Sequence, residues 1–187
     1  MQNNAEGLHS RAGSPRENKD MRLFIALQLN EACKEAIAEA IDAMRAQDIR
    51  ANYVPEDNMH VTLAFLGEVE AGSIPAIEDA ICSVPYSPLT LTIGGIGNFG
   101  HLLYVGMEDN PGLRKYVSVL RQALDEHGID YDRKKFKAHI TIARKVESKR
   151  AFHLHVKTAK VTVNGVSLMR SDRVNGGMRY TEIGYFS

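Results

Sequence analysis

The sequence is poor in the residues that disulfide scaffolds and metal centres require. It holds two cysteines, Cys33 and Cys82, and no tryptophan among 187 residues. Neither cysteine has a second cysteine or a histidine nearby at metal-ligand spacing, which excludes a zinc site built on either one. We interpret both as small apolar core residues of a protein in a reducing compartment.

Long apolar runs are absent as well. No stretch of the sequence approaches the roughly 18 consecutive apolar residues that a membrane-spanning helix needs. The N-terminus lacks the apolar stretch of a signal peptide. We therefore predict a cytoplasmic protein with no membrane partner, and we expect it to be a monomer.

The charges of the chain balance. Lysine and arginine together number 23, as do aspartate and glutamate, so the formal net charge is zero and no overall field attracts nucleic acid. One local segment is basic and contains Lys134, Lys135, Lys137, Arg144, Lys145, Lys149 and Arg150. Such a run is either a solvated face or a surface that holds phosphates, and its composition alone does not separate the two.

The chain divides into a polar tail and one folded unit. Residues 1–20 contain a single leucine and are rich in asparagine, serine, glycine and charge, which predicts a disordered tail. The apolar run MRLFIALQL that begins at Met21 is typical of a buried strand. We therefore place a single folded domain over residues 21–187.

Helices and strands are mixed along this domain. Asparagine caps and apolar periodicity predict helices over 31–47, 73–83 and 111–128. Short apolar and β-branched runs predict strands at 60–67, 89–95, 101–107, 139–146, 158–169 and 178–186. The mixture predicts an α+β fold. The order strand, helix and H-x-T strand occurs near 22, 31 and 60 and again near 101, 112 and 139, which indicates two similar halves.

Two segments of one pattern carry the candidate chemistry. They read MHVTLAFLGEV and AHITIARKV. Because side chains alternate between the faces of a strand, His60 and Thr62 share one face, about 6.7 Å apart along the chain. His139 and Thr141 share a face in the same way. The aliphatic residues between and after them point to the opposite face and anchor each strand in the core.

Chance and a purely structural role are the alternatives to a catalytic one. The chain has seven histidines, and two H-x-T pairs would arise by chance in roughly 3 chains of 100. In the structural alternative, two half-buried histidines on unrelated strands hydrogen-bond to the threonines. The aliphatic residues that flank both pairs in the same way favour the catalytic interpretation.

Two imidazoles and two hydroxyls around one polar cleft would suit a phosphodiester. A neutral imidazole can accept a proton from water, and a protonated one can donate a proton to the departing oxygen, each worth roughly 10² to 10⁴ in rate. The unperturbed pKa of histidine, about 6.5, makes both forms accessible near neutrality. The threonine hydroxyls can donate to the non-bridging oxygens, where negative charge builds.

A cyclic phosphate is a suitable substrate for a site that has only two imidazoles and two hydroxyls. The strained five-membered ring needs less assistance than an open diester does. The motifs contain no aspartate, glutamate or cysteine beside the histidines, and the sequence has no HExxH motif. We therefore predict neither a metal ion nor another cofactor.

These segments resemble the paired motifs of the 2H phosphoesterase superfamily, which is named for two H-x-[ST] tetrapeptides. Within that superfamily the chain is similar to the RNA 2',3'-cyclic phosphodiesterases, also called 2'-5' RNA ligases. The similarity spans about Met21 to Ser187 and includes RLFIAL as the opening strand and VSLMRSDRVNGGMRYTEI as the closing hairpin.

The resemblance implies a bilobal fold in which two pseudo-symmetric halves, with mainly antiparallel sheets, surround a central cleft and carry helices outside. It implies hydrolysis of 2',3'-cyclic phosphate ends of RNA to 2'-phosphates, with a weak reverse reaction that joins 2',5' ends. RNA with such an end is the partner it implies. By position, His60 and His139 would be the catalytic acid and base. Thr62 and Thr141 would hold the phosphate.

Two further residues follow from the resemblance with open alternatives. Arg144 would be another phosphate or RNA contact, although a surface salt bridge explains an isolated arginine equally well. Tyr53 stands where relatives often carry a tryptophan. It is either a residue that stacks on a base or a half-buried packing residue.

Two other functions stay open on the sequence. One is a phosphodiesterase for a small cyclic nucleotide such as ADP-ribose cyclic phosphate, although the basic segment favours a polynucleotide. The other is a module that binds RNA ends or nucleotides without turnover. Both histidines and both threonines are present, so the sequence gives no sign of a lost catalyst.

Overall fold

The computed structural model describes residues 20–148 and 154–187, so nearly all of the expected N-terminal tail lies outside the described residues. In chain order the elements are β1 (Met21–Gln28), α1 (Glu31–Ala46), β2 (Arg50–Tyr53), β3 (His60–Val69), α2 (Ile74–Cys82), β4 (Leu89–Phe99), β5 (Leu102–Met107), α3 (Pro111–Glu126), β6 (His139–Glu147), β7 (Ala159–Val163), β8 (Val166–Val174) and β9 (Gly177–Phe186). Within these ranges, no helix has the length and apolar character required to cross a membrane.

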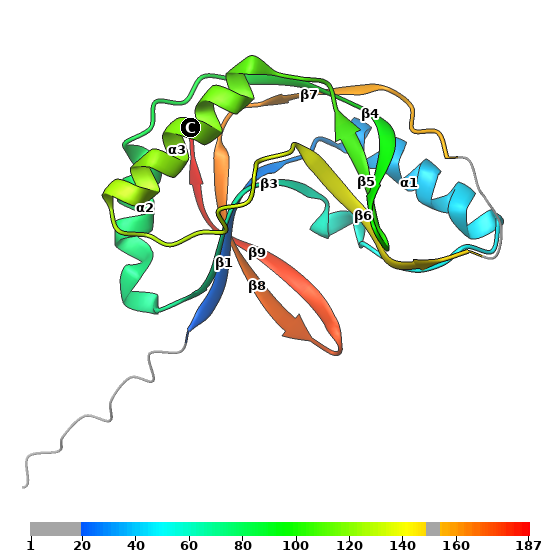
Figure 1. Ribbon diagram of the computed structural model, residues 1–187, viewed down its shortest axis with the longest axis horizontal. Helices are drawn as coiled ribbons and strands as arrows, with labels where there is room; N and C mark the ends of the chain where they lie inside the picture. Colours follow the sequence, from blue (N-terminus) through cyan, green and yellow to red (C-terminus); the bar gives the residue numbers. More distant parts are fainter. Residues whose placement is uncertain (1–19, 149–153) are drawn as a thin grey trace, which may run out of the picture.

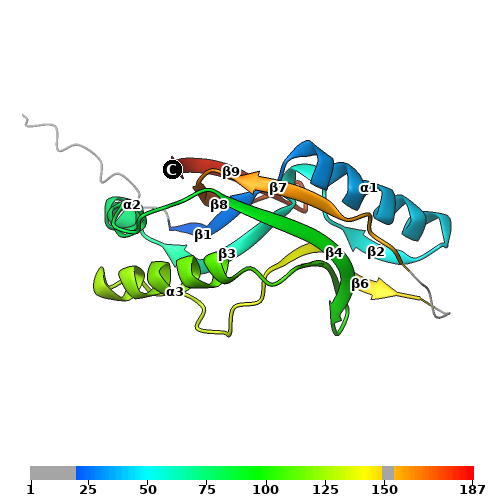
Figure 2. The same ribbon diagram turned by 90° about the horizontal axis from the view of Figure 1, so that it is seen from above.

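The strands form two antiparallel sheets. One sheet has the strand order β3-β1-β8-β9, and the other has the order β2-β6-β5-β4-β7. Helix α1 lies at one side of the molecule, and α2 and α3 lie together at the other side (Figures 1 and 2). The β8–β9 hairpin extends away from the helices (Figure 1). The predicted α+β fold with antiparallel sheets is confirmed.

The three helices begin and end close to the predicted residues. The Asn30 side chain accepts a hydrogen bond from the Cys33 amide at 3.0 Å, and the Asn110 side chain accepts one from the Leu113 amide at 2.9 Å. Both asparagines therefore cap their helices as expected. Cys33 is buried, and burial raises the pKa of its thiol. Cys82 is exposed at the end of α2, so its interpretation as a core residue is wrong.

The strands differ from expectation in length and in number. Strand β4 continues to Phe99 instead of ending at 95, and β8 continues to Val174 instead of ending at 169. The run expected as one strand over 158–169 is two strands, because Asn164 and Gly165 separate β7 from β8. A Cβ added to Gly165 would collide with the backbone carbonyl of Phe186, so the chain turns where only glycine fits. Strand β2 was not expected, because its four residues, RANY, are few and contain no β-branched residue.

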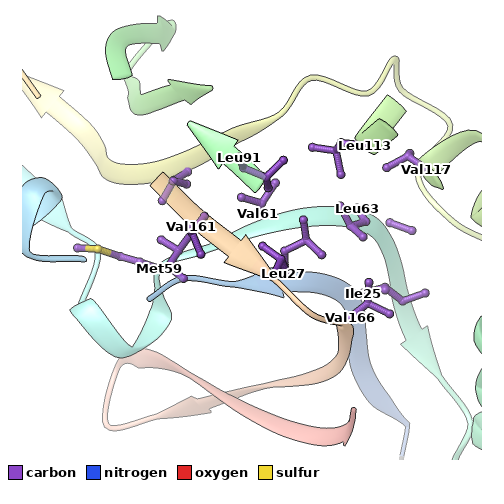
Figure 3. Packing of buried hydrophobic residues seen from close by; sticks show 14 of the residues in the cluster. Ile25, Leu27, Met59, Val61, Leu63, Leu91, Leu113, Val117, Val161 and Val166 are labelled. Atoms are coloured by element: carbon purple, nitrogen blue, oxygen red, sulfur yellow. The ribbon is translucent and has the colours of Figure 1, made fainter. Parts of the chain in front are cut away.

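One hydrophobic core joins both sheets to the helices. Its members come from β1, β3, β4, β7, β8 and α3 and include Ile25, Leu27, Val61, Leu63, Leu91, Leu113, Val117, Val161 and Val166 (Figure 3). In β6, Ile140 and Ile142 are fully buried in the same core. The aliphatic residues of both motifs therefore anchor their strands, as the alternation predicted.

The two halves repeat one arrangement around the motif strands. In the first half β3 runs antiparallel to β1, and His60 lies opposite Gln28. In the second half β6 runs antiparallel to β5, and His139 lies opposite Gly106. The order β1-α1-β3 thus recurs as β5-α3-β6, and β3 and β6 contact each other. This contact brings the two H-x-T motifs together from opposite halves.

The packing of α3 can be tested with two neighbouring residues. Leu120 is fully buried, whereas Val119 is 39% exposed on the same helix. We expect Leu120→Ala to lower the free energy of unfolding by about 2–5 kcal/mol, because it removes buried surface and leaves a cavity. Val119→Ala should change it by less than about 0.5 kcal/mol. Urea denaturation followed by circular dichroism measures both values, and similar small losses in the two variants would contradict the core position of α3.

Candidate active site

His60 opens β3 and is half-buried at the edge of the first sheet. Its ring Nδ1 lies 2.8 Å from the backbone oxygen of Asn58. A carbonyl can only accept, so Nδ1 carries the proton and the neutral ring has its lone pair on Nε2. The Thr62 hydroxyl lies 2.9 Å from Nε2 and donates to it. The reactive nitrogen of His60 is therefore Nε2, beside a hydroxyl on the same face of the strand.

His139 opens β6 in the same way. Its Nδ1 lies 2.7 Å from the backbone oxygen of Lys137, again the carbonyl two residues earlier. The same argument places the proton on Nδ1 and leaves Nε2 of His139 available. Thr141 follows on the same face and lines the same cleft. Both histidines are thus held by local backbone geometry that the two motifs share.

A β-bulge follows the threonine at the same position in both motifs. The register shifts there, and one residue, Leu63 in β3 and Ile142 in β6, has no partner on the neighbouring strand. The bulge reverses the alternation of side chains beyond it. As a result Phe65 and Arg144, each five residues after the histidine, return to the cleft face. Without the bulge, simple alternation would turn both side chains toward the core.

These residues meet in one open cleft of about 1080 Å³. Five of the six site residues predicted from the sequence line it: His60, Thr62, His139, Thr141 and Arg144. The β8–β9 hairpin also contributes Ser171, Asp172, Arg173, Met178 and Tyr180 to the lining of the cleft. The fold therefore gathers residues from both halves of the chain and from its C-terminal hairpin around one space.

Tyr53 does not lie among the residues that line this cleft. Its hydroxyl donates to the backbone oxygen of Ile49 at 2.6 Å, and its ring packs against the core. The guanidinium of Arg45 lies 4.9 Å from the ring centroid. These contacts match the packing role that the sequence left open for Tyr53, rather than a contact with a base.

The basic residues of the cleft differ in their partners. Arg22 lies 4.0 Å from Glu68, and Lys134 lies 2.8 Å from Asp132, so each has a carboxylate beside it. Arg144 forms no ion pair within residues 20–148 and 154–187. Its guanidinium is therefore available to an anion beside the histidines. Lys149 and Arg150 of the basic segment lie outside the described residues.

Three residues that the sequence did not reveal as site residues, Asn58, Tyr180 and Phe24, surround His60. The buried Asn58 side chain donates to the Met178 carbonyl at 2.7 Å and accepts from the Tyr180 amide at 3.3 Å. It therefore ties β9 to the turn that holds His60. The Tyr180 ring meets the His60 imidazole edge-on, with ring centroids 5.3 Å apart. The Phe24 ring packs against the same imidazole, with centroids 4.7 Å apart. The asparagine two positions before the motif histidine was the available signal.

The surroundings of His60 disfavour its charged form. Burial lowers the pKa of His60 below its ordinary value, and the positive charges of His139 and Arg144 lower it further. The hydrogen bond to the Asn58 carbonyl acts in the opposite direction and only partly offsets them. In the free protein His60 is therefore neutral at pH 7. In the part of the chain that the structure describes, no cluster of three or more histidine, cysteine, aspartate or glutamate side chains could hold a metal ion.

Known proteins are similar to this chain in sequence and in fold. The model of a family described as the 2'-5' RNA ligase superfamily matches residues 33–175. An RNA 2',3'-cyclic phosphodiesterase of Thermotoga maritima is 35% identical over 131 residues, which make up 66% of this chain and 70% of that protein. One from Escherichia coli is 27% identical over 169 residues, covering 89% of this chain and 96% of that protein.

Solved structures give the same result. The crystal structure of E. coli LigT in its apo form matches with a TM-score of 0.80 at 26% identity, and it covers 90% of this chain and 97% of that chain. The structure of E. coli LigT complexed with 3'-AMP matches over the same shares of the two chains, with a TM-score of 0.78. The antiparallel α+β architecture around the cleft is therefore shared over nearly the whole of both chains.

The electrostatic coupling across the cleft can be measured directly. We expect the His60 ring to titrate below the ordinary histidine pKa of about 6.5. Arg144→Gln should raise the pKa of His60, because it removes a positive charge that opposes protonation. Arg114→Gln is the control. Arg114 lies on α3 and is paired with Asp109, so this change should leave the titration of His60 unchanged. Proton NMR of the imidazole Cε1–H across pH gives these values, and an unshifted His60 in the Arg144 variant would disprove the coupling.

Proposed function

This chain belongs to the 2'-5' RNA ligase superfamily, and we propose that its cleft hydrolyses the 2',3'-cyclic phosphate at the end of an RNA to a 2'-phosphate. The relatives at 35% and 27% identity carry the name RNA 2',3'-cyclic phosphodiesterase. The observation that carries the proposal is the meeting of two H-x-T strands, which puts two histidines and two threonines around one cleft. The protein is accordingly an enzyme of the phosphodiesterase class.

The histidines perform both proton transfers in the proposed reaction. The cyclic phosphate lies between the two Nε2 atoms. A neutral imidazole accepts a proton from water as the water oxygen bonds to phosphorus. The protonated imidazole donates its proton to the 3' oxygen as the bond from phosphorus to that oxygen breaks. The products are a 3'-hydroxyl and a 2'-phosphate, and the two histidines end with their protonation states exchanged.

The remaining cleft residues stabilise charge on the phosphate. The hydroxyls of Thr62 and Thr141 donate to non-bridging oxygens, where negative charge grows in the transition state. Arg144 adds a charge-assisted contact on the same face. A bound phosphate anion raises the pKa of a neighbouring imidazole, so substrate binding favours the protonated form that the acid must have. Because two imidazoles serve as acid and base, the reaction needs no metal-bound hydroxide.

One chain supplies every residue of the proposed mechanism, which supports a monomer as the working unit. The core shared by both sheets supports a single domain over residues 21–187. The cysteines Cys33 and Cys82 are both free. Free thiols suit the reducing conditions of the cytoplasm, which is where we propose that the enzyme acts.

Loss of either histidine should abolish turnover. We expect His60→Ala and His139→Ala each to lower kcat by at least about 10²-fold on an RNA that ends in a 2',3'-cyclic phosphate, because each removes one proton transfer. His127→Ala is the control, since that ring lies at the C-terminal end of α3 and its Nδ1–H donates to the Ala123 carbonyl at 2.8 Å. Product analysis should show a 2'-phosphate, with the rate unchanged by a metal chelator. Near-full activity in either motif variant would refute the mechanism, and chelator sensitivity would refute its independence of metal.

The rate should depend on pH in a bell-shaped manner. One histidine must be neutral, so kcat/KM falls as the pH drops through its pKa, and the other must be charged, so kcat/KM falls as the pH rises through its pKa. Because burial lowers the pKa of His60, one limb of the profile should lie below the ordinary value of about 6.5. Initial rates at low substrate concentration across pH test this. A profile that is flat between pH 5 and 8 would be incompatible with two titrating imidazoles.

A further inference from the structure

Two aromatic rings form a stack beside His139. Tyr104 of β5 and Phe99 at the end of β4 have ring centroids 4.5 Å apart and planes inclined by 28°. Tyr104 is buried, whereas Phe99 is 47% exposed. Gly97 of β4 makes room for the stack, because a Cβ at that position would collide with the Tyr104 ring. We refer to Phe99 and Tyr104 together as the aromatic shelf.

The neighbours of the shelf leave the outer face of Phe99 open. Lys137 Nζ lies 4.7 Å from the Tyr104 centroid and 5.1 Å from the Phe99 centroid. A cation above the outer face of Phe99 would be nearer to Phe99 than to Tyr104, so Lys137 must lie beside the stack. His139 is 5.4 Å from both rings and meets both edge-on, which places it beside the stack as well. Among residues 20–148 and 154–187, the ring and cation contacts of Phe99 thus lie at its inner face or its edge, and 47% of the residue is exposed.

The shelf adjoins the cleft. Phe99 lies opposite Leu102 in the β4–β5 ladder, and Leu102 lines the cleft together with His139 and Thr141. A ribose separates the base of a nucleotide from its 2',3'-cyclic phosphate by about the width of one sugar ring. A phosphate bound at His139 therefore leaves its own base within reach of the shelf. The Lys137 ammonium beside the stack adds positive charge, which favours a nearby phosphate.

The aromatic neighbours of the other histidine, His60, are less exposed than Phe99. Phe24 is 3% exposed and packs at 4.7 Å against the imidazole, and the half-buried Tyr180 meets the imidazole edge-on at 5.3 Å. Within residues 20–148 and 154–187, Tyr185 is the other strongly exposed aromatic residue besides Phe99, and it is not among the cleft residues. Phe99 therefore differs from the other aromatic side chains in being both exposed and adjacent to a motif histidine.

We propose that the outer face of Phe99 stacks on the base of the terminal nucleotide, the one that bears the cyclic phosphate. This inference rests on the proposed function, because the phosphate must lie between the histidines for the base to reach the shelf. Stacking on an aromatic ring tolerates all four bases, since each presents a π face. The shelf therefore strengthens binding of nucleotide ends without selecting their sequence.

The test compares two substrates that differ in one base. The first is an RNA oligomer that ends in uridine 2',3'-cyclic phosphate. The second is the same oligomer with an abasic ribose 2',3'-cyclic phosphate at its end. Phe99→Ala and Phe99→Leu should raise KM for the first substrate by about tenfold or more, the size of one lost base–aromatic stack, while kcat changes little. Neither variant should change KM for the abasic substrate, and Phe99→Trp should keep the low KM for the first.

Tyr185→Ala serves as the matched control, since Tyr185 is 52% exposed and lies outside the cleft. It should leave KM unchanged for both substrates. If the Phe99 variants raise KM equally for both substrates, or for neither, the shelf does not bind the terminal base. If the wild-type protein opens neither cyclic phosphate, the proposed function fails instead. The two failures are thus distinguishable.

Discussion

Both imidazoles of this protein are held by one kind of hydrogen bond, from the ring Nδ1–H to the backbone carbonyl two residues earlier. The acceptors are the oxygens of Asn58 and Lys137, at 2.8 and 2.7 Å. This bond fixes the tautomer and the ring direction together, so that Nε2 of each histidine points into the cleft. An acid and base pair needs the Nε2 atoms of both histidines to face the substrate. Two rings that could turn freely would not hold them there.

A β-bulge in each motif strand is the second local feature that shapes the cleft. The histidine and the threonine share a face by simple alternation, but Arg144 follows Thr141 by three residues and would turn toward the core on a regular strand. The unpaired Ile142 reverses the alternation, and Leu63 does so at the matching place in β3. Two consecutive residues are buried after each threonine, and the next side chain then reaches the cleft. The bulge thus belongs to the site as much as the histidines do.

Periodicity and capping signals in the sequence were enough to predict the three helices, most strands and the pairing of the motifs in two similar halves. They also predicted that His60, Thr62, His139 and Thr141 would share strand faces, because alternation is a local property. They did not predict Asn58, whose amide contacts β9 about 120 residues further along the chain. Nor could they separate the two roles open to Tyr53, since the choice depends on which segment its ring packs against. Contacts of that kind depend on tertiary packing, which a local sequence pattern does not predict.

A symmetric pair of motifs must still perform an asymmetric reaction, because one imidazole has to begin neutral and the other charged. The motifs themselves are nearly identical, so the difference must come from what surrounds them. His60 is enclosed by Phe24, Tyr180 and the hairpin that Asn58 ties down, and burial lowers its pKa. His139 lies instead between Lys137 and a stack whose outer ring faces solvent. Tyr180 of the C-terminal hairpin packs on His60, whereas Phe99 and Tyr104 pack on His139, so segments outside the two motifs give the two imidazoles different surroundings.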